Sequence, residues 1–387
     1  MEQKLLFTSE SVSEGHPDKV CDQIADAILD ECLKQDSNSR VACECLATKQ
    51  FLLIAGEITT NAKINYKKIA RDVIKDIGYD RKCLGFDYKN VKIKVKIKQQ
   101  SNDIALGVNK ENKMEQGAGD QGIMFGYATN ETKGYMPLAI SIAHKLVRVA
   151  SNLRKSGDFK HARPDMKSQV TIDYTDLKNI KIDTILMSVQ HDDNIDLEEF
   201  RKYIHDEIMV KVAKSFNLNT DFVSYINPTG RFVIGGPEGD TGVTGRKIIV
   251  DTYGGASRHG GGSFSGKDPS KVDRSAAYYA RYMAKNLVAA GVADRLEIQL
   301  SYGIGLADPI SISLSTFKTS KYSDEVILKI INKIFDARPY SIIKQFSLDK
   351  PHFKYKDTAN YGHFGRGDLN LPWEKLDKVE QIKRLLK

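Results

Sequence analysis

The stretch from Gly235 to Asp273 reads GGPEGDTGVTGRKIIVDTYGGASRHGGGSFSGKDPSKVD, and the rest of the chain is arranged around it. Its glycines alternate with basic residues and aspartates, so it is too glycine-rich to form a hydrophobic core. Backbone N–H groups of such loops can approach phosphate oxygens, while lysine and arginine neutralise the phosphate charge. Carboxylates can hold Mg²⁺ against the same oxygens. The stretch therefore predicts a polyphosphate site with metal ions, and a set of solvated turns is the simpler alternative.

Two short motifs fit nucleotide-binding patterns but lack the structural context that makes them specific. Residues 261–267 follow the P-loop pattern, yet Asp268 stands where the Mg²⁺-binding Ser or Thr belongs, and no apolar strand directly precedes them. Residues 117–122 fit GxGxxG, but the preceding NKENKMEQ is polar and cannot be the strand that a dinucleotide-binding fold needs. Neither a P-loop nor a Rossmann fold is therefore expected.

Composition limits the class of protein. The chain has 387 residues, of which 41% are hydrophobic, and a formal net charge of +8. The length suggests two or three domains, and the modest positive excess suits anionic small molecules as well as nucleic acid. Five cysteines without CxxC spacing predict reduced, mostly buried thiols. Because no apolar run approaches the ~20 residues that cross a bilayer and the N-terminus does not resemble a signal peptide, we expect a cytoplasmic protein without a membrane partner.

The segment SVSEGHPDK (11–19) leads into a helix whose apolar residues recur on one face of residues 20–34. Pro17 stands at the first turn, where proline is favoured. His16, Asp18 and Lys19 then lie at the positive end of the helix dipole, which is a natural anion site. Simple capping of the helix by these residues is an equally good interpretation.

Residues 41–60 are expected to form two strands, and residues 64–78 an amphipathic helix. Glu44 and Glu57 fall within the strands, where a carboxylate usually faces solvent unless it serves a site. Residues 91–98 alternate as VKIKVKIK, which predicts a half-exposed strand. Its lysines are better explained as protection against edge-to-edge pairing than as a nucleic-acid surface.

Beyond residue 100 the chain reads as a polar loop, SNDIALGVNKENKMEQ (101–116), and loops of this length are often functional lids. Asp165 and Lys167 are expected on a loop that leads into a strand. Further helices are expected over residues 136–157, 196–216, 272–291 and 323–336, with a last one from Trp373. Blocks of strands, mostly joined as hairpins, and helices thus recur about three times. This order favours three α+β units over one doubly wound sheet, although no sequence repeat is visible.

Three long blocks together resemble the signatures of S-adenosylmethionine synthetases, also called methionine adenosyltransferases. The blocks are GHPDK (15–19) with the helix after it, GAGDQGIMFGYA (117–128) and GGGSFSGKDPSKVDRSAAY (260–278). The resemblance extends over nearly the whole chain, from FTSESVSEGHPDK to DTANYGHFGR. One departure is Ser263, where the family usually has alanine.

The resemblance implies an α+β fold of three similar domains related by pseudo-threefold symmetry, with mixed or antiparallel sheets and helices on one face. The domains would be residues 1–101, 117–233 and 234–387, with a mobile active-site loop at 102–116 between the first two. It also implies a homodimer with active sites at the subunit interface, often paired into a tetramer. ATP and L-methionine would be the substrates.

The resemblance also carries the family's functional positions onto this chain, residue by residue. Two Mg²⁺ ions per site would be held by Asp18 and Asp273, and K⁺ by Glu44. Methionine would contact Glu57, Gln100, Asp120, Asp240 and Lys271, under a mobile loop at about residues 100–110. ATP would contact His16, Asp165, Lys167, Arg231, Phe232, Asp240, Arg246, Lys247, Ser263 and Lys267. The catalytic residues among these would be His16, Lys167, Arg246 and Lys267.

The implied reaction joins the methionine sulfur to C5′ of ATP and expels triphosphate, which is then hydrolysed to phosphate and diphosphate. Because a thioether has no proton to lose, the attack needs no general base, and the many cations of the sequence suit a strongly anionic leaving group. A phosphoryl-transfer enzyme is the first rival, but no Walker A serine or catalytic aspartate is evident. A nucleic-acid-binding module is the second, but the lysine-rich strand has no interleaved aromatic residues.

Overall fold

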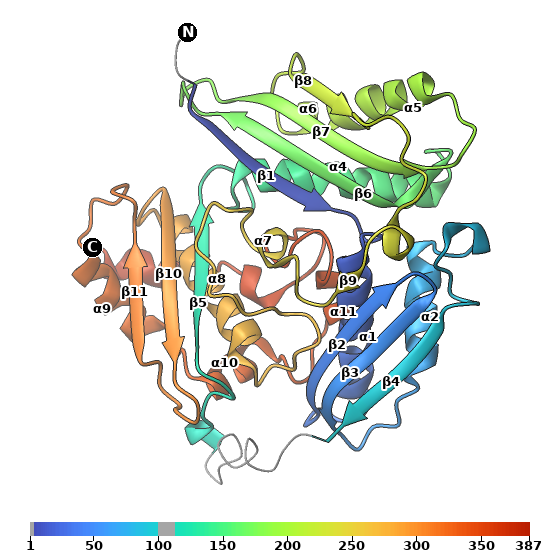
Figure 1. Cartoon of the computed structure of the whole chain (residues 1–387). Helices are drawn as coiled ribbons and strands as arrows, with labels where there is room; N and C mark the ends of the chain where they lie inside the picture. The colour runs from blue at the N-terminus through green and yellow to red at the C-terminus, as the bar shows by residue number, and fades with distance from the viewer. Residues whose placement is uncertain (1–3, 100–112) are drawn as a thin grey trace.

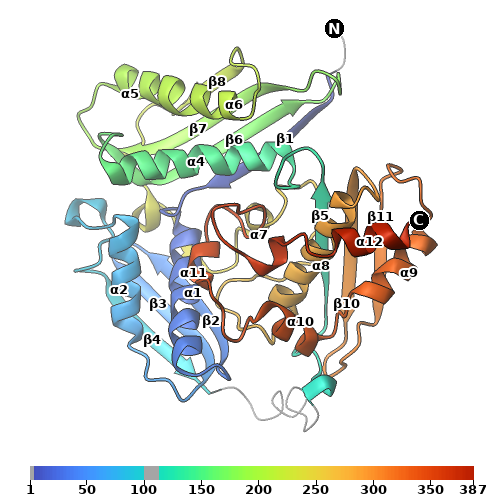
Figure 2. The same ribbon diagram turned by 180° about the vertical axis from the view of Figure 1, so that it is seen from behind.

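Three sheets form the frame of the protein in the computed structural model, which describes residues 4–99 and 113–387. They are arranged around a common centre. Their helices lie behind them in Figure 1 and in front of them in Figure 2. The predicted α+β fold with three similar units and helices on one face is therefore confirmed.

The first sheet has the order β4-β3-β2-β9, with β4 parallel to β3 and the other neighbours antiparallel. Its strands are β2 (Arg40–Thr48), β3 (Phe51–Thr59), β4 (Lys92–Lys98) and β9 (Gly242–Val243), and its helices are α1 (Pro17–Gln35) and α2 (Tyr66–Ile77). Gly78 ends α2 with a φ of +107°, a conformation that suits glycine. The four lysines of β4 are exposed at the edge of the sheet, as its alternation predicted.

The second sheet has the order β1-β6-β7-β8 and lies at the top of Figure 1. Its strands are β1 (Leu6–Val12), β6 (Ala162–Asp173), β7 (Lys181–His191) and β8 (Val223–Ile226). Its helices are α4 (Leu138–Ser156), α5 (Leu197–Tyr203) and α6 (Lys211–Ser215), and a π-helical segment, Ile204–Val210, joins α5 to α6. The single helix predicted over residues 196–216 is therefore continuous but changes its winding in the middle.

The third sheet has the order β11-β10-β5. Its strands are β5 (Gly122–Thr129), β10 (Arg295–Tyr302) and β11 (Ser311–Ser315), and its helices are α8 (Val272–Ala289), α9 (Asp324–Ile334), α10 (Pro339–Phe346) and α12 (Val379–Leu385). Two short helices, α7 (Ile248–Asp251) and α11 (Tyr355–Thr358), lie between the sheets (Figure 1). Gly291, at a φ of +79°, follows the end of α8, as the sequence predicted.

In each third of the chain, the first strand belongs to the sheet of another third. β1 pairs antiparallel with β6, β5 with β10, and β9 with β2. Helix α4 covers β1 and β6, α8 covers β5 and β10, and α1 covers β9 and β2. This cyclic exchange locks the three units to one another and agrees with the threefold relation expected for them. The domain boundaries drawn from the sequence stay a prediction.

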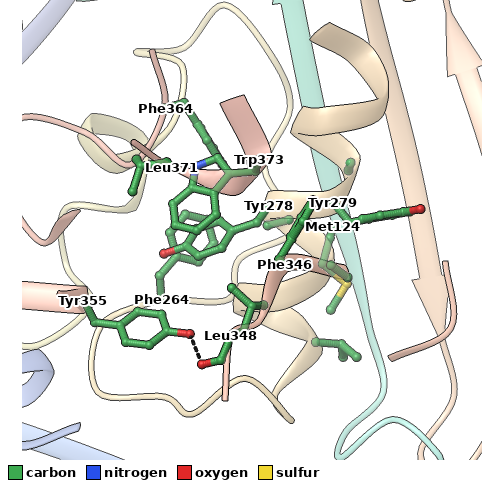
Figure 3. Close-up of a cluster of buried hydrophobic side chains, with 14 of the residues drawn as sticks. Met124, Phe264, Tyr278, Tyr279, Phe346, Leu348, Tyr355, Phe364, Leu371 and Trp373 are labelled. Atoms are coloured by element: carbon green, nitrogen blue, oxygen red, sulfur yellow. Dashed lines mark hydrogen bonds between the residues drawn. The ribbon is translucent and has the colours of Figure 1, made fainter. Parts of the chain in front are cut away.

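The larger hydrophobic core joins the first and third units. Figure 3 shows its aromatic centre, where Trp373 stacks on Tyr278 with ring centroids 3.8 Å apart. Phe264, from the glycine-rich stretch, meets Tyr278 edge-on at 5.5 Å between centroids. Aromatic pairs of this kind contribute about 0.5–1.5 kcal/mol beyond the area they bury. The glycine-rich stretch is therefore anchored in the core through Phe264.

Two details predicted from the sequence are wrong. Asp165 and Lys167 lie within a strand and not on a loop before it, because β6 already starts at Ala162 and takes up an irregularity as a β-bulge. The last helix starts at Val379 and not at Trp373, because Trp373 lies in a single 3₁₀ turn. Neither boundary has a strong local signal in the sequence.

The cysteines follow the prediction of reduced, mostly buried thiols. Cys21, Cys32, Cys43 and Cys45 are free and buried, and Cys83 is free and exposed. In the parts of the chain that the structure describes, no helix has the length and apolar character to cross a membrane.

Candidate active site

His16 is held at the N-terminus of α1. Its ring Nδ1 accepts a hydrogen bond from the backbone N–H of Asp18 at 3.2 Å. Burial and the nearby Lys247 lower the pKa of His16 to about 3. Because an amide N–H can only donate, Nδ1 carries no proton, and the neutral ring has its proton on Nε2. The capping role considered for this residue is therefore correct, and it leaves the Nε2 proton for another partner.

Asp18 joins the start of α1 to the loop before α7. Its Oδ1 accepts from the backbone N–H of Val243 at 2.9 Å, and its Oδ2 accepts from Lys247 Nζ at 2.9 Å. Burial opposes ionisation of this carboxyl, but the bonds from Lys247 and Val243 outweigh it and keep the pKa of Asp18 below its usual value. A carboxylate and a cation thus stand side by side at the positive end of a helix.

Asp165 on β6 is buried near the same helix end. Its Oδ2 accepts from the backbone N–H of Gly236 at 2.8 Å, whereas Oδ1 is buried and has no hydrogen-bond partner among residues 4–99 and 113–387. Burial raises the pKa of Asp165 to about 6, against the opposing effects of Gly236 and Lys167. A buried acceptor without a partner costs free energy, which a donor on a ligand would recover.

Lys167, on the same strand, is exposed and adds positive charge near His16. These residues form one group, which we call the helix-end cluster: His16, Asp18, Asp165, Lys167 and Lys247.

The glycine-rich stretch lies along β2. The backbone N–H of Cys43 donates to the carbonyl of Gly266 at 2.9 Å, and the N–H of Gly266 donates to Asp26 Oδ1 at 2.9 Å. Gly266 has a φ of +81°, and a Cβ there would lie 2.0 Å from the Cys43 carbonyl oxygen, so only glycine fits. The backbone next to Lys267 is therefore fixed against the first sheet.

Two ion pairs within this stretch place cations beside carboxylates. Lys267 Nζ lies 2.5 Å from Asp273 Oδ2, and Lys271 pairs with the buried Asp268. Asp268 Oδ2 also accepts from the backbone N–H of Val41 at 2.7 Å, which ties the pair to β2. We call this second group the glycine-loop cluster: Lys267, Asp268, Lys271 and Asp273.

Glu44 and Glu57 lie on the open face of the first sheet, and both are exposed. Desolvation by the surrounding protein raises the pKa of Glu44 to about 7, while Lys267 acts in the opposite direction. Asp22 and Glu57 add to the increase because their negative charges disfavour another one. Glu44 therefore lies within electrostatic reach of Lys267, and a bound cation would favour its charged form.

Two predicted ATP contacts follow β8. Arg231 is exposed and pairs with Asp193, with Nη2 3.0 Å from Oδ2. The backbone N–H of Phe232 donates to His191 Nε2 at 3.0 Å, which fixes the chain there and leaves the ring partly exposed. Neither residue bonds to the helix-end cluster.

The remaining predicted contacts lie around the two clusters. Ser263 neighbours Gly245, where a Cβ would lie 2.5 Å from that of Ser263. Three of the predicted side chains belong to exposed residues, namely Asp120, Asp240 and Arg246. Gln100 and the predicted mobile loop at residues 100–110 lie outside the described residues.

A buried ion group supports the helix-end cluster, and it contains Lys19, which the sequence interpretation placed in the anion site itself. Lys19 is 0% exposed and paired, so it lies beneath that site and not in it. Lys19 Nζ donates to Asp22 Oδ2 at 3.0 Å and also to Asp251. Asp22 Oδ1 accepts from the backbone N–H of Gly245 at 2.9 Å. The signal that could have revealed it is the repeat of aspartate at every fourth residue of α1.

The two clusters are separate groups. Across residues 4–99 and 113–387, no hydrogen bond or ion pair joins a side chain of the helix-end cluster to one of the glycine-loop cluster. The loops that carry Lys247 and Lys267 approach each other at the Ser263 side chain, which lies beside Gly245. Each cluster therefore presents its own cation and carboxylate.

The donor set suits Mg²⁺ bound together with a polyphosphate. Within the described part of the chain, no three His, Cys, Asp or Glu side chains gather into a metal site made of protein alone. Mg²⁺ does not need such a site, because it keeps several waters and is held by one or two carboxylates plus substrate phosphates. Asp18 and Asp273 each place one carboxylate beside a lysine, where a phosphate would bind.

Comparison with known proteins covers almost the whole chain. Residues 4–102, 115–232 and 234–375 match the models of the N-terminal, central and C-terminal domains of S-adenosylmethionine synthetase. The chain is 64% identical over 379 residues to the S-adenosylmethionine synthase of Mesoplasma florum, covering 98% of this chain and 99% of the relative. It is 63% identical over 385 residues to that of Mycoplasma mycoides subsp. mycoides, covering 100% of this chain and 98% of the relative.

A further relative comes from another group of bacteria. The chain is 57% identical over 390 residues to the S-adenosylmethionine synthase of Clostridium tetani, covering 98% of this chain and 99% of the relative. The chain therefore belongs to the S-adenosylmethionine synthetase family, and the methionine adenosyltransferase activity expected from its sequence is confirmed.

Proposed function

We propose that the helix-end cluster and the glycine-loop cluster together form the site where the methionine sulfur attacks C5′ of ATP. The observation that carries this proposal is the carboxylate–lysine pair in each cluster, Asp18 with Lys247 and Asp273 with Lys267. All four residues lie next to glycine-rich backbone or a helix end, where backbone N–H groups favour phosphate binding. A polyphosphate would engage the lysines and leave the carboxylates for Mg²⁺.

His16 is proposed to assist the departure of triphosphate. Its neutral ring can donate the Nε2 hydrogen bond to the bridging oxygen, on which negative charge grows as the C5′–O bond breaks. The electron pair of the sulfur forms the new bond to C5′, and the pair of the broken bond leaves with the triphosphate. Lys167, Arg246 and Lys267 would stabilise that charge. Because the attacking thioether has no proton to lose, no general base is needed.

The nucleoside is proposed to bind beside Asp165 and Phe232. The unpartnered Oδ1 of Asp165 can accept an N–H or O–H of the nucleoside. The partly exposed ring of Phe232 can stack on adenine. Three more ATP contacts are proposed from the resemblance to the family: Arg231, Asp240 and Ser263.

Methionine is proposed to bind near the open face of the first sheet. Glu57 and Asp120 are exposed carboxylates that suit its ammonium group. The remaining contacts proposed from the family are Gln100, Asp240 and Lys271. Closure of the loop at about residues 100–110 over the amino acid stays a prediction.

Two Mg²⁺ ions are proposed to be held by Asp18 and Asp273 together with the phosphates, and K⁺ by Glu44. Bound Mg²⁺ supplies neutralisation of the charge on the triphosphate. The pKa of Glu44 is raised to about 7, so a neighbouring cation would favour its charged form.

A second copy of the chain is proposed to complete the site. The two clusters do not bond to each other within the described residues, and the half-buried pair Leu46 and Leu53 lies on the open face next to Glu44. Ile249, beside Lys247, is 42% exposed. These apolar side chains suit a protein surface as their cover. We infer a homodimer with active sites at the subunit interface, and we expect two such dimers to pair into a tetramer. We also still predict a cytoplasmic protein without a nucleic-acid partner.

Product analysis tests the proposed chemistry. Purified protein with ATP, L-methionine, Mg²⁺ and K⁺ should yield a sulfonium product, phosphate and diphosphate in equal amounts. Formation of ADP with a phosphorylated acceptor would instead support a phosphoryl-transfer enzyme. Omission of methionine serves as the control, because it removes the nucleophile and should abolish triphosphate release.

A further inference from the structure

Helix α1 carries an aspartate at every fourth residue, and residues four apart lie on the same face of a helix. Each of the four carboxylates accepts a hydrogen bond from a backbone N–H of a distant segment. We call this set the aspartate ladder: Asp18 accepts from Val243 at 2.9 Å, Asp22 from Gly245 at 2.9 Å, Asp26 from Gly266 at 2.9 Å and Asp30 from Tyr355 at 2.8 Å. The ladder aligns three segments of the chain along one helix.

Asp22 holds the backbone that carries two cationic side chains proposed to bind phosphate. Its Oδ1 accepts from Gly245, the residue directly before Arg246 and Lys247. Its Oδ2 is neutralised by Lys19, which also pairs with Asp251 on α7, so the far end of the same loop is tied to the same ion group. Asp22 is 0% exposed and cannot touch a ligand. It can therefore act on a ligand only through the groups that it holds, which are the loop at Gly245 and the ammonium of Lys19.

Asp26 and Asp30 hold other segments in the same way. Asp26 accepts from Gly266, beside Lys267, and is neutralised by two bonds from Arg274, both at 2.7 Å. Asp30 accepts from the N–H groups of Tyr355 and Lys356, at the start of α11. Within the ladder, only the two bonds to Asp30 serve a segment without a predicted site residue, so Asp30 can act as a control.

We propose that Asp22 is a positioning residue, which sets the place of the Arg246 and Lys247 cations relative to His16 and Asp18 on the helix end. The proposal rests on the proposed role of Arg246 and Lys247 in holding the triphosphate. Asp18 and Asp22 lie one helical turn apart on α1. This distance matches the one between their partners Val243 and Gly245, which are two residues apart on an extended loop. Loss of the Gly245 bond would let the loop shift, and a displacement of about 1 Å at a reacting centre can cost roughly 10²-fold in rate.

Asp22→Asn tests the proposal, with Asp30→Asn as the matched control. Both substitutions keep the size of the side chain but leave one acceptor oxygen where the carboxylate uses two. In Asp22→Asn the N–H of Gly245 and the ammonium of Lys19 therefore compete for one oxygen. In Asp30→Asn the N–H groups of Tyr355 and Lys356 compete in the same way. We expect Asp22→Asn to lower kcat by about 10- to 100-fold and to raise the KM for ATP, with the KM for methionine changed by less than about twofold. Asp30→Asn should leave kcat and both KM values within about twofold of the wild type. Circular dichroism and Tm establish that both variants are folded.

Binding of inorganic triphosphate gives a readout that a general loss of structure would not reproduce. Asp22→Asn should weaken this binding, measured by calorimetry, by about tenfold in the wild-type background. In the Arg246→Ala/Lys247→Ala background it should weaken binding by less than about twofold, because its effect passes through those side chains. If Asp22→Asn fails to fold, Asp22→Glu takes its place with the same expectations, since it keeps the charge for Lys19 but displaces the carboxylate.

The outcomes separate the two proposals. Wild-type kcat and triphosphate binding in folded Asp22→Asn, or an equal loss in Asp30→Asn, would overturn the positioning role. An undiminished effect of Asp22→Asn in the Arg246→Ala/Lys247→Ala background would do the same. If Arg246→Ala/Lys247→Ala itself binds triphosphate like the wild type, the phosphate role proposed for those cations is wrong, and the positioning role is lost with it.

Discussion

The helix-end cluster and the glycine-loop cluster use the same chemical groups in different surroundings. In the first, Asp18 is bound by Lys247 and by a backbone N–H, and its side chain is 4% exposed. In the second, Lys267 and Asp273 bond to each other, and their side chains are 20% and 23% exposed. The first pair is held by the fold, whereas the second is held mainly by its own attraction.

This difference suggests separate roles for the two clusters in the proposed site. The lysines of the two pairs are similarly exposed, Lys247 at 22% and Lys267 at 20%, so the contrast lies in the carboxylates. Separating Asp18 from Lys247 would leave a buried, desolvated carboxylate, which is expensive. Asp273 keeps contact with water, so the glycine-loop cluster can release Lys267 to a phosphate and Asp273 to a cation at a lower cost. The helix-end cluster provides the fixed geometry against which that rearrangement takes place. Each of the following experiments breaks or sharpens this contrast.

The largest effect is expected from Lys267→Ala. Removal of this cation should lower kcat by a factor on the order of 10² or more, because it deprives the leaving group of a charge partner. The fold should survive, since the backbone around Lys267 is held by Gly266 and Phe264. Steady-state kinetics with a Tm measurement check both statements.

Lys329→Ala is the matched control for this experiment, because Lys329 is an exposed lysine that pairs only with Glu325 on α9. It should leave kcat unchanged. Wild-type turnover in a folded Lys267→Ala protein would remove the glycine-loop cluster from the catalytic site.

A smaller effect is expected at His16. His16→Ala should lower kcat by roughly 10- to 100-fold, because it removes one hydrogen-bond donor to the leaving oxygen. Since the pKa of His16 is about 3, the residue is neutral throughout the assay range and should contribute no inflection near pH 6.5. The pH profile of kcat is the measurement. A wild-type inflection near pH 6.5 that disappears in His16→Ala would contradict the neutral donor.

Burial of neutral His16 also has a consequence for stability. Between pH 6.5 and 3 the unfolded chain binds a proton at this residue that the folded chain does not. The stability that depends on the neutral ring is therefore present above pH 6.5 and is lost as the pH falls. Chemical denaturation at pH 5 and pH 7 should show a shallower loss in His16→Ala than in the wild type.

Glu44 is expected to make K⁺ activation depend on pH. Its pKa of about 7 means that a proton competes with K⁺ below this pH and not above it. The half-saturating K⁺ concentration should be about tenfold higher at pH 6 than at pH 8. Titration of activity with K⁺ at both pH values, with a large organic cation for ionic strength, provides the data. An unchanged K⁺ response in Glu44→Gln would show that K⁺ acts elsewhere.

The smallest effect is expected at Ser263, the point where the two clusters approach. The family usually has alanine here, so the ATP contact proposed at Ser263 is expected to be made by the backbone and not by the hydroxyl. Ser263→Ala should change kcat and the KM for ATP by less than about twofold. A tenfold change would mean that the hydroxyl itself binds ATP.

Much of the fold could be predicted because its signals are local. The apolar face of α1, the glycine after α2 and the lysine alternation of β4 all depend on neighbouring residues. The exchange of β1, β5 and β9 could not be predicted, because pairing between distant strands leaves no periodic trace in either one. The two-residue β9 is also too short to carry a pattern.

The site was predictable to a similar extent. The resemblance named the residues that meet substrate, and the structure brings His16, Asp18, Asp165 and Lys247 to one helix end. The resemblance did not reveal that Lys19, Asp22 and Asp251 form a buried supporting group, because such groups are recognised only from their bonds. Their aspartate repeat was visible, but a run of carboxylates on a helix is more often a solvated face.

A subunit complementation measurement tests most directly whether one site combines the helix-end cluster of one chain with the glycine-loop cluster of another. Lys167→Ala and Lys267→Ala are each expected to be nearly inactive as homodimers. The two are co-expressed with different tags, and the mixed dimer is isolated. It should recover about half of the wild-type kcat per dimer, because one of its two sites then holds both wild-type clusters. A mixed dimer as inactive as its parents would contradict the account, since both clusters would then have to act within the same chain.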